Sequence, residues 1–491
     1  MTTGRHLAKA LGYGLSGGLA VLIVLAILFL NRRTDLSVWH EVKLEGEFTA
    51  DSRVKTFADY LDLEDALFDE LNHKVFETTE PVPTGSHSVN RYRSGSLADS
   101  RSGDRDWNRT FELKPDTAPT AGFLLLHGMS DSPYSLRAIG ERLHQAGGHV
   151  IGLRLPGHGT APSGLTDFEW EDMDAAVRLA ARHLSDSIDG KPLYLIGYSN
   201  GGALSVHYAL ECLDDESLPA PSGIILISPA IGVTPMASLA VWQMRLGHWL
   251  GLEKLEWNSI LPEYDPYKYV SFAVNAGHQV YRLTTDISDH LDRLAPTGKL
   301  DQLPRILAFQ SIVDATVSTP ALVDGLLGRL PATGHELVIF DINRVVQAES
   351  LLTHDPTDSL AHLLSDSSEP FDITVLSNTT TMDSHLRIRS APAGRPRESD
   401  TFTDTELVWP KGIYSLSHVS LPFSPNDPLY GNGESPDARR DYPLGNLALR
   451  GERGVLQVSA ADQLRLRWNP FYGYLESRIL AFVGIGGATP R

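Results

Sequence analysis

The chain has 491 residues, of which 42% are hydrophobic and 21% are charged, and this composition is typical of a globular protein rather than a disordered one. Its formal net charge of −19 excludes a basic surface of the kind that binds nucleic acid. The single cysteine, Cys212, excludes an intrachain disulfide and a cysteine metal site.

The N-terminal end has the pattern of a membrane anchor. A hydrophobic stretch runs from Leu11 to Leu30, about the length of a helix that crosses a bilayer, and Arg32 and Arg33 follow it. No small-x-small cleavage pattern comes next, which favours an uncleaved signal anchor over a cleaved signal peptide. We expect a single-pass membrane protein with its catalytic domain on the outer (periplasmic or extracellular) face. Basic residues flank both ends of the hydrophobic stretch, so the positive-inside rule discriminates little between this orientation and the opposite one.

Residues 31–110 lead into the core. Apolar residues between Phe57 and Leu71 recur at helical spacing with acidic residues between them, which predicts an amphipathic helix. Segments 89–92 and 110–113 are predicted as edge strands, separated by a loop rich in serine, glycine and arginine.

From residue 122 onward, short apolar runs alternate with helical segments such as 136–146 and 173–184. Apolar runs of this length are typical of strands buried on both faces, and their alternation with helices predicts a mainly parallel sheet with helices on both faces. The runs begin at Gly122, Val150, Leu193, Gly223, Arg305 and Leu337.

Two insertions interrupt this alternation. Residues 231–300 contain Trp242, Trp249 and Trp257 and then a helical segment, which predicts a cap over a pocket, although some of these aromatics must pack onto the sheet. Residues 346–405 are polar, with one strand-like run from Phe371 to Leu376. Segment 464–468 is a further possible strand.

The residues from Gly197 to Gly201 form the pattern G-x-S-x-G with Ser199 at its centre. An apolar run precedes the pattern and a helical segment follows it, as expected of a serine held on a sharp turn between strand and helix. Glycine is needed on either side because a side chain there would clash with the neighbouring strand or helix. Ser199 is therefore the candidate nucleophile.

A serine nucleophile needs a histidine base and an acid that orients the base. Asp314 is the first candidate for the acid because it follows an apolar strand at the same sheet edge as Ser199, and Asp341, which also follows a strand, is the alternative. His418 is the first candidate for the base because a short hydrophobic segment leads into it. His385 is the second, whereas His335 precedes its strand and is expected at the wrong end of the sheet.

Together these motifs resemble the α/β-hydrolase fold family, in its monoacylglycerol-lipase and serine-aminopeptidase-like group. The resemblance spans roughly residues 120–420 and implies a Ser199–His418–Asp314 triad and an oxyanion hole made by the backbone amides of Met129 and Asn200. Asp314 and His418 are 104 residues apart, farther than in most relatives, and the polar insertion supplies that length. The matching segments are Leu125–Met129, Leu155–Gly159, Gly197–Gly202, the Asp314 loop and the Ser417–His418 step; His127 and His158 within them match positions that are usually structural.

The expected activity is hydrolysis of carboxylic, acyl or lipid-like esters through an acyl-enzyme, with no metal or cofactor required. An amidase or aminopeptidase with the same triad is the first alternative, with Glu253, Glu256, Glu263 and Asp265 available to bind an amine. An inactive, membrane-tethered binding protein is the second. The expected partners are a small-molecule or lipid ester and, through the N-terminal helix, a membrane; the oligomeric state stays open.

The expected organisation follows from these segments. It comprises a tail (1–10), a transmembrane anchor (11–30), a lead-in (31–110), the first half of the core (111–230), a cap (231–300), the continued core (301–345), a polar insertion (346–405) and a histidine loop with the C-terminal region (406–491).

Overall fold

The computed structural model describes residues 32–485 except 84, 104, 233–251, 346–351, 354–355, 366–368, 440 and 453–454. Before Arg32 it describes only Tyr13, Gly14, Gly17, Gly18 and Val21. The cap tryptophans Trp242 and Trp249 lie outside the described residues.

A ten-stranded sheet forms the centre of the molecule, in the order β1-β3-β2-β4-β5-β8-β9-β10-β11-β12. The seven strands from β3 to β10 in this order are parallel, whereas β1, β11 and β12 pair antiparallel with their neighbours. The mainly parallel sheet expected from the apolar runs is therefore confirmed. Its strands are β1 (Phe111–Leu113), β2 (Gly122–Leu126), β3 (His149–Leu153), β4 (Leu193–Tyr198), β5 (Gly223–Ile227), β8 (Ile306–Ser311), β9 (Glu336–Phe340), β10 (Asp372–Thr380), β11 (Asp383–Ala391) and β12 (Thr401–Val408).

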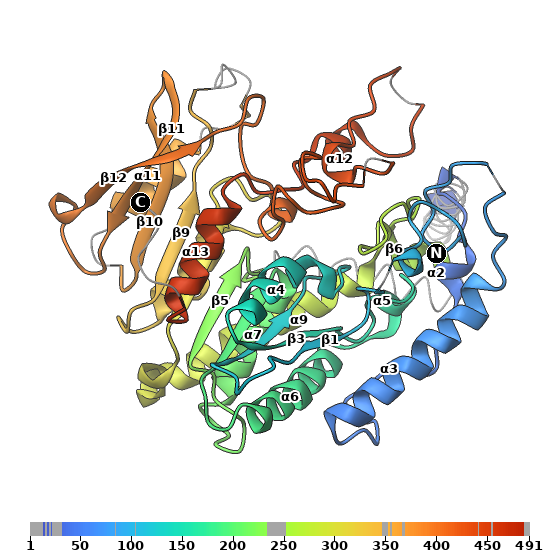
Figure 1. Cartoon of the computed structure of the whole chain (residues 1–491), viewed down its shortest axis with the longest axis horizontal. Coiled ribbons are helices and arrows are strands. Elements are labelled where there is room, and N and C mark those ends of the chain that lie inside the picture. The colour runs from blue at the N-terminus through green and yellow to red at the C-terminus, as the bar shows by residue number, and fades with distance from the viewer. Residues whose placement is uncertain are drawn as a thin grey trace, which may run out of the picture.

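Helices cover both faces of this sheet, as expected (Figure 1). Side chains alternate along β2, so that Leu124 and Leu126 pack on one face while Phe123 and Leu125 pack on the other. The first face packs against α6, α7 and α9, and the second against α4 and α13. The described helices are α2 (Val38–Glu41), α3 (Phe57–Leu71), α4 (Arg137–Gln145), α5 (Gly164–Asp167), α6 (Trp170–Ser187), α7 (Asn200–Glu211), α9 (Val274–Leu294), α10 (Thr319–Gly325), α11 (Thr357–Ser365), α12 (Ala460–Leu464) and α13 (Tyr472–Phe482).

The helix α3 of the lead-in has the bounds that the apolar stripe predicts. Its N-cap is Thr56, whose hydroxyl accepts a hydrogen bond from the amide of Asp59, while the Asp59 carboxylate accepts one from the amide of Thr56. Phe57, Tyr60 and Leu67 form part of its buried face. The lead-in therefore packs against the core through this face of α3 and is not connected to it by the backbone alone.

Two expected strands are absent from the described structure. Segment 89–92 is not a strand, because the amide of Arg91 donates to the carbonyl of Glu263 instead of entering a ladder. Segment 464–468 is not a strand either, because α12 ends at Leu464 and the chain after it runs irregularly beside the histidine loop. The edge strand expected near Thr110 is confirmed as β1.

The polar insertion contains more regular structure than the sequence pattern predicts. Only the run from Phe371 is predicted as a strand, yet β10, β11 and β12 follow one another as an antiparallel extension of the sheet. Most of β12 is exposed, and β11 is buried chiefly at Leu386 and Ala391. Strands of this kind lack the continuous apolar run that marks a buried strand.

The residues after His418 pack against residues of the cap region. Aromatic side chains of this segment, among them Phe423, Tyr430 and Tyr442, form one buried cluster with Tyr264 of the cap region and Tyr134 before α4. In Figure 1 the segment that carries α12 runs along the edge of the sheet away from α6. This cluster joins parts of the chain that are almost 300 residues apart, as the hydrogen bond between Tyr134 and Asp427 illustrates.

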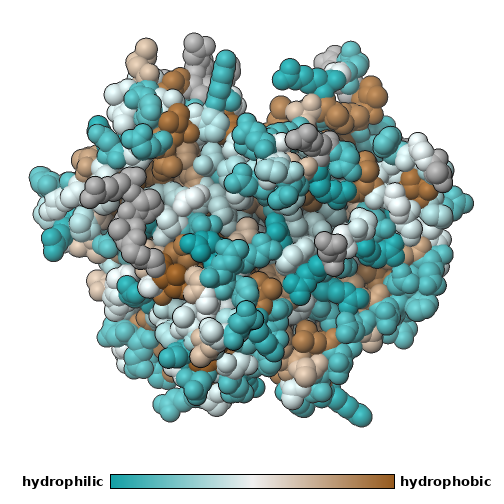
Figure 2. Space-filling model, viewed as in Figure 1, coloured by the Kyte–Doolittle hydropathy of each residue, from teal (hydrophilic) through white to brown (hydrophobic). Residues whose placement is uncertain are grey.

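The expectation of a membrane helix and of an outer-face location is corrected by this structure. Among the described residues, we find no helix with both the length and the apolar character needed to cross a bilayer. Residues 11–30, on which the expectation rests, lie outside the described residues except at five positions. On the face drawn in Figure 2, hydrophobic residues form small separate patches among hydrophilic ones.

Candidate active site

Ser199 lies at the apex of the turn between β4 and α7. β4 ends at Tyr198 and α7 begins at Asn200, and Ser199 between them has φ 53° and ψ −117°. A positive φ is unfavourable for a residue with a side chain, so this backbone is strained and is held by its surroundings. The strand–turn–helix context expected for the G-x-S-x-G pattern is therefore present.

The glycines of the pattern are required for a steric reason that the structure makes specific. A Cβ atom at Gly197 would lie 2.3 Å from the carbonyl oxygen of Gly201. A Cβ atom at Gly201 would lie 2.0 Å from the carbonyl oxygen of Leu126 on β2. Both contacts are with backbone atoms, so no side-chain rearrangement relieves them.

The structure brings the three sequence-predicted side chains into one hydrogen-bonded chain. The Nε2 atom of His418 is 3.1 Å from the Oγ atom of Ser199, and its Nδ1 atom is 2.9 Å from Oδ2 of Asp314. The other carboxylate oxygen of Asp314 accepts hydrogen bonds from the amides of Thr316 and Val317 at 2.8 and 3.0 Å. All four of these donor–acceptor distances lie within the range of hydrogen bonds.

The Asp314 side chain is fully buried, and its environment favours the ionised form. Burial by itself raises the pKa of this carboxyl, but the hydrogen bond and charge of His418 and the two backbone amides together lower the pKa below its ordinary value. The carboxylate is therefore available at neutral pH to orient the histidine.

The loop that carries His418 is anchored at two places. The hydroxyl of Ser311, the last residue of β8, donates to the carbonyl of Leu416 at 2.9 Å. The hydroxyl of Ser417 donates to the carbonyl of Leu466 at 2.5 Å. These bonds hold the imidazole, which is only 5% exposed, against the end of the sheet.

The alternative acid and base lie elsewhere. Asp341 follows β9 but forms an ion pair with Arg344 at 2.8 Å. His385 lies on β11, where it pairs with the neighbouring Asp383 and is half exposed. His335 immediately precedes β9 and accepts the amide hydrogen of the first residue of β8, at the opposite end of the strands, as expected.

Met129 and Asn200 both line the cavity that contains Ser199. Neither amide donates a hydrogen bond to any described part of the chain. Asn200 is the first residue of α7, where an amide has no partner within the helix. Two such donors beside a serine hydroxyl can stabilise a negatively charged oxygen.

His127 and His158 support this loop rather than the serine. His127 donates from Nδ1 to the carbonyl of Gly128 at 2.8 Å and accepts at Nε2 from the amide of Leu155 at 3.1 Å. Burial and the nearby His158 hold the pKa of His127 well below its usual range, so it stays neutral. His158 Nε2 lies 3.2 Å from the sulfur of Met129.

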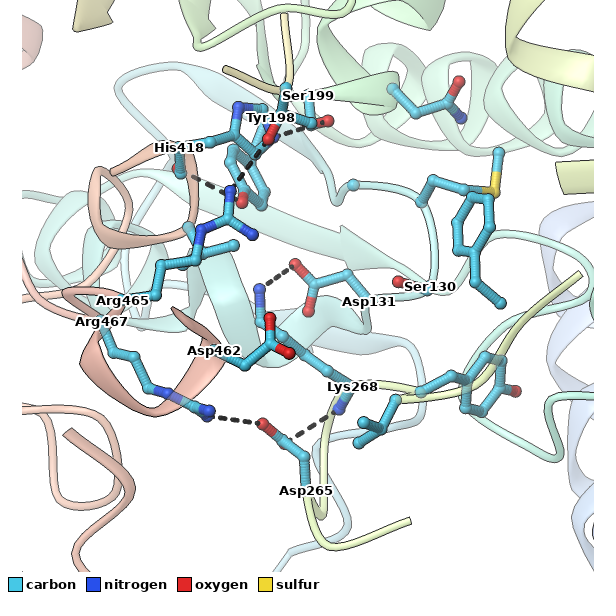
Figure 3. Close-up of a pocket in the computed structure, with 18 of the residues that line it drawn as sticks. Ser130, Asp131, Tyr198, Ser199, Asp265, Lys268, His418, Asp462, Arg465 and Arg467 are labelled. Atoms are coloured by element: carbon cyan, nitrogen blue, oxygen red, sulfur yellow. Dashed lines mark hydrogen bonds and ion pairs between the residues drawn. The ribbon is translucent and has the colours of Figure 1, made fainter. Parts of the chain in front are cut away.

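A cavity of about 450 Å³ opens beside Ser199, and Figure 3 shows its lining. Its walls come from the cap region, the loop after β2 and the C-terminal segment. Most of the lining is apolar or aromatic, as is usual for ligand cavities. The lining from the cap and the C-terminal segment includes Leu261, Tyr264, Tyr269, Val270, Phe272, Val280, Val419, Phe423, Tyr430 and Val458.

Charged side chains also line this cavity, and most are paired. Lys268 forms an ion pair with Asp131 at 3.1 Å, and Arg467 lies 3.6 Å from Asp265. Arg465 donates to the hydroxyl of Thr316 at 2.9 Å and has no ion pair with a described residue. In Figure 3 Arg465 lies beside His418 and Tyr198.

The sequence interpretation missed the C-terminal contribution to this cavity. Arg465 and Arg467 come from segment 464–468, interpreted as a possible strand because apolar and polar residues alternate there, and Asp462 lies just before it. A segment that lines a cavity also has one apolar and one polar side, so alternation alone does not identify a strand.

A second cluster of polar groups has the ligand types of a metal site. Asp174, His207 and Glu211 each place one ligand atom within 4.8 Å of the others. Arg178 forms an ion pair with Asp174 at 2.7 Å. His207 donates hydrogen bonds to the carboxylates of Asp174 and Asp286, and these bonds outweigh burial and raise the pKa of His207 to about 9. In the described structure these groups are joined to one another and to Arg178 by ion pairs.

Comparison with known proteins agrees with this architecture. The sequence model of the family described as "Serine aminopeptidase, S33" matches residues 117–310, which include Ser199 and end before Asp314 and His418. The chain has an α/β-hydrolase fold. This family match covers part of the core and the cap region, and it does not extend into the polar insertion or the C-terminal segment.

Two curated relatives match shorter stretches. A thermostable monoacylglycerol lipase of Bacillus sp. (strain H-257) is 30% identical over 117 residues, which are 24% of this chain and 44% of the lipase. A putative 2-succinyl-6-hydroxy-2,4-cyclohexadiene-1-carboxylate synthase of Haemophilus influenzae is 28% identical over 111 residues, 22% of this chain and 41% of the synthase. The chain thus spans less than half the length of these curated relatives.

Solved structures with a similar core include a monoacylglycerol lipase from Paleococcus ferrophilus, with 19% identity and a TM-score of 0.35 over 47% of this chain and 88% of the lipase. Est1E from Butyrivibrio proteoclasticus, bound to ferulic acid, has 16% identity and a TM-score of 0.32 over 52% of this chain and 96% of Est1E.

Proposed function

We propose that the chain is a serine hydrolase that cleaves carboxylic esters of acyl or lipid-like substrates through an acyl-enzyme. The observation that carries this proposal is the hydrogen-bonded chain from Ser199 through His418 to Asp314, on a strained turn beside two amides without internal partners. This arrangement has each component that acyl transfer needs, namely a nucleophile, a base, an orienting acid and donors for an oxyanion.

In the first step His418 takes the proton of the Ser199 hydroxyl at Nε2 while Oγ attacks the ester carbonyl. The amides of Met129 and Asn200 donate to the oxygen that becomes negative, and this stabilisation is the largest expected contribution to the rate. His418 then gives its proton to the departing alcohol. His418 then deprotonates a water, whose oxygen attacks the acyl-enzyme, and returns that proton to Oγ of Ser199 as the acid is released, while Asp314 stays ionised throughout.

The lining of the cavity supports an ester substrate that has an apolar part and a polar part. Leu261, Val270, Val280 and Val317 provide apolar surface, and the ion pairs of Lys268 and Arg467 add polar surface to the same cavity. The partial similarity to a monoacylglycerol lipase agrees with an acyl ester of this kind.

An amidase or aminopeptidase is the rival proposal, and it requires an acidic side chain free to bind the amine of the substrate. Asp131 and Asp265 line the cavity but are each paired with a cation, and Glu263 is buried and accepts hydrogen bonds from two backbone amides. Asp462, exposed and bonded to the hydroxyl of Ser459, is the remaining acid of the lining. Because Asp131 and Asp265 are paired with cations and Glu263 already accepts two hydrogen bonds, the lining favours an ester substrate over one that carries an amine.

Labelling with a fluorophosphonate probe tests the nucleophile and the base. We expect the full chain to be labelled, and Ser199→Ala and His418→Ala to lose labelling, because the probe needs an activated serine. His385→Ala is the matched control, since this histidine is half exposed on β11 and paired with Asp383, and it should keep full labelling.

The same preparation should hydrolyse a monoacylglycerol or a nitrophenyl ester at least about tenfold faster than an aminoacyl amide of matched size. A folded wild-type chain that neither takes the label nor cleaves an ester would contradict the proposal and favour a binding protein. Faster cleavage of the amide would favour the peptidase.

A further inference from the structure

The loop that follows β2 lies directly against the candidate nucleophile, and we call its residues 128–132 the β2 loop. A Cβ atom added to Gly128 would lie 3.1 Å from the Cβ atom of Ser199. The next residue is Met129, whose amide is an oxyanion donor in the proposed function. Ser130 after it has φ 59°, a left-handed conformation that is unfavourable for a residue with a side chain. Such a conformation persists only where surrounding contacts hold it.

Two neighbouring residues of the cap region supply contacts of this kind. The amide of Tyr269 donates a hydrogen bond to the carbonyl of Ser130 at 2.7 Å. The Nζ atom of Lys268 lies 3.1 Å from Oδ2 of Asp131. The other carboxylate oxygen of Asp131 accepts a hydrogen bond from the amide of Ser132 at 2.9 Å. The Asp131 side chain therefore joins the lysine of the cap region to the backbone of the β2 loop.

The pair formed by Lys268 and Asp131 is enclosed. The Asp131 side chain is 3% exposed and the Lys268 side chain 18%. The Lys268 ammonium also lies 5.4 and 5.1 Å from the centres of the Tyr198 and Phe423 rings. Burial raises the pKa of the Asp131 carboxyl, and the charge of Lys268 opposes that rise. Without this lysine, the β2 loop would carry a buried carboxylate that has lost its ion-pair partner.

The lysine is itself held in place from the C-terminal segment. The Oδ1 atom of Asp265 accepts hydrogen bonds from the amides of Tyr267 and Lys268 at 3.0 and 3.1 Å, and these bonds close the turn that carries the lysine. Asp265 in turn lies 3.6 Å from Arg467. Figure 3 shows these groups in series, ending at Asp131. The ammonium is thus fixed against the β2 loop.

We propose that Lys268 is a positioning residue: its ion pair with Asp131 holds the β2 loop against Ser199, so that the Met129 amide meets the oxyanion at hydrogen-bond distance. This role rests on the proposed hydrolase function, and it gives the cap region a part in the reaction besides lining the cavity. A displacement of about 1 Å at a reacting centre can lower the rate about a hundredfold. Loss of the pair should therefore lower kcat and leave KM nearly unchanged.

Steady-state hydrolysis of a nitrophenyl ester by the full chain measures both constants. Lys268→Met keeps the aliphatic stem and removes the ammonium, and we expect kcat to fall at least about tenfold while KM stays within about twofold of the wild-type value. A boronic acid inhibitor should lose affinity by a similar factor, because one oxygen of its serine adduct takes the place of the oxyanion. Lys268→Arg keeps the charge and should recover most of kcat.

Asp131→Asn tests the other half of the pair. It should lower kcat in the same way. The double variant Lys268→Met/Asp131→Asn should lose no more than the more impaired single variant, because all three lack the same ion pair. The double variant also leaves no buried carboxylate without its partner at this position, so it decides the question if Lys268→Met does not fold.

Lys254→Met is the matched control. Lys254 also lies in the cap region and forms an ion pair, with Asp35 at 2.6 Å, but it is not among the described residues that line the cavity. This variant should keep the wild-type kcat and KM. Hydrogen–deuterium exchange in a peptide that spans residues 127–135 adds a readout that does not need activity. Exchange should be faster in Lys268→Met than in the wild type or in Lys254→Met.

Two results would overturn the positioning role. One is a raised KM with unchanged kcat in Lys268→Met, which would make Lys268 a group that binds substrate directly. The other is wild-type kcat or wild-type exchange in both Lys268→Met and the double variant. A wild-type chain that cleaves no ester contradicts the proposed function instead, and the exchange measurement then decides by itself whether Lys268 holds the β2 loop.

Discussion

The conformation of Ser199 depends both on its neighbours in the sequence and on the packing of the strand and helix around it. Its positive φ is tolerated because Gly197 and Gly201 let the strand and the helix approach without side chains between them. The turn exposes the hydroxyl to the cavity while the following amide stays free to donate. In the proposed mechanism, backbone strain at this one position would serve both the nucleophile and the oxyanion donors.

The steric argument predicts a large difference between two Gly→Ala substitutions. Gly201→Ala should destabilise the chain by more than about 4 kcal/mol or prevent folding, because the new Cβ would lie 2.0 Å from a backbone oxygen. Gly277→Ala in α9 should instead leave stability unchanged or raise it by about 0.5–1 kcal/mol, since the nearest atom is 3.9 Å away.

Chemical unfolding of both variants, followed by circular dichroism, measures these changes. Equal stability of the two variants would contradict the clash at Gly201.

At the scale of elements, α6, α7 and α9 are joined by charged groups as well as by apolar packing. His207 on α7 contacts Asp174 of α6 at 3.2 Å and Asp286 of α9 at 3.1 Å. Burial would lower the pKa of this histidine, but these carboxylates raise the pKa to about 9. The protonated imidazole is therefore a structural cation between three helices that pack on one face of the sheet.

This cation predicts a specific pH dependence. The folded-state pKa of about 9 exceeds the ordinary value of 6.5, so the stabilisation is complete below pH 6.5 and is lost as the pH rises to about 9. The free energy of unfolding should fall in this window by up to about 3 kcal/mol. His207→Gln should be less stable at pH 6 and should lose this part of the pH dependence.

Urea unfolding at pH 6, 7.5 and 9 measures the effect. Burial and Asp174 raise the pKa of Glu211 to about 7, whereas the charge of His207 lowers it, so the loss of stability that Glu211 causes from pH 4.5 upward should extend to higher pH in the variant. An identical slope between pH 7 and 9 in both proteins would contradict the role of His207.

At the scale of the whole molecule, the hydrolase core is enclosed by segments from both ends of the chain. The C-terminal segment lines the cavity beside Ser199, and the lead-in is joined to the core by a buried arginine. Arg154, which follows β3 and is fully buried, pairs with Glu47 at 2.9 Å and with Glu64 of α3 at 3.0 Å. Neither segment is a detachable domain.

The Arg154 network predicts how strongly the lead-in is bound. Arg154→Ala should destabilise the chain by about 3–5 kcal/mol, because it leaves two carboxylates without their cation in a buried site. Arg282→Ala is the matched control, since Arg282 also contacts two glutamates but is one-third exposed, and it should cost at most about 1 kcal/mol.

The midpoint of thermal unfolding and limited proteolysis before residue 110 report both effects. A lead-in that stays protected and a wild-type midpoint in Arg154→Ala would show that packing of α3 alone holds it.

The sequence by itself determined the elements whose signals are local. The buried parallel strands carry continuous apolar runs, α3 carries an apolar stripe, and the turn at Ser199 requires glycines within two residues of it, so each could be predicted from neighbouring residues. Asp314 and Ser199 could be paired because both follow strands at one sheet edge, and the structure brings them to His418.

Only the tertiary structure decided features that depend on contacts distant in the chain. A short hydrophobic segment before it favoured His418 over His385, but the hydrogen bonds from Ser311 to Leu416 and from Ser417 to Leu466, which hold the His418 loop at the end of the sheet, appear in no local pattern. The strands β11 and β12 are half exposed and paired at a sheet edge, so they lack the apolar run that marked β2 or β4. Burial and long-range pairing are properties of the whole chain, and a window of sequence contains neither.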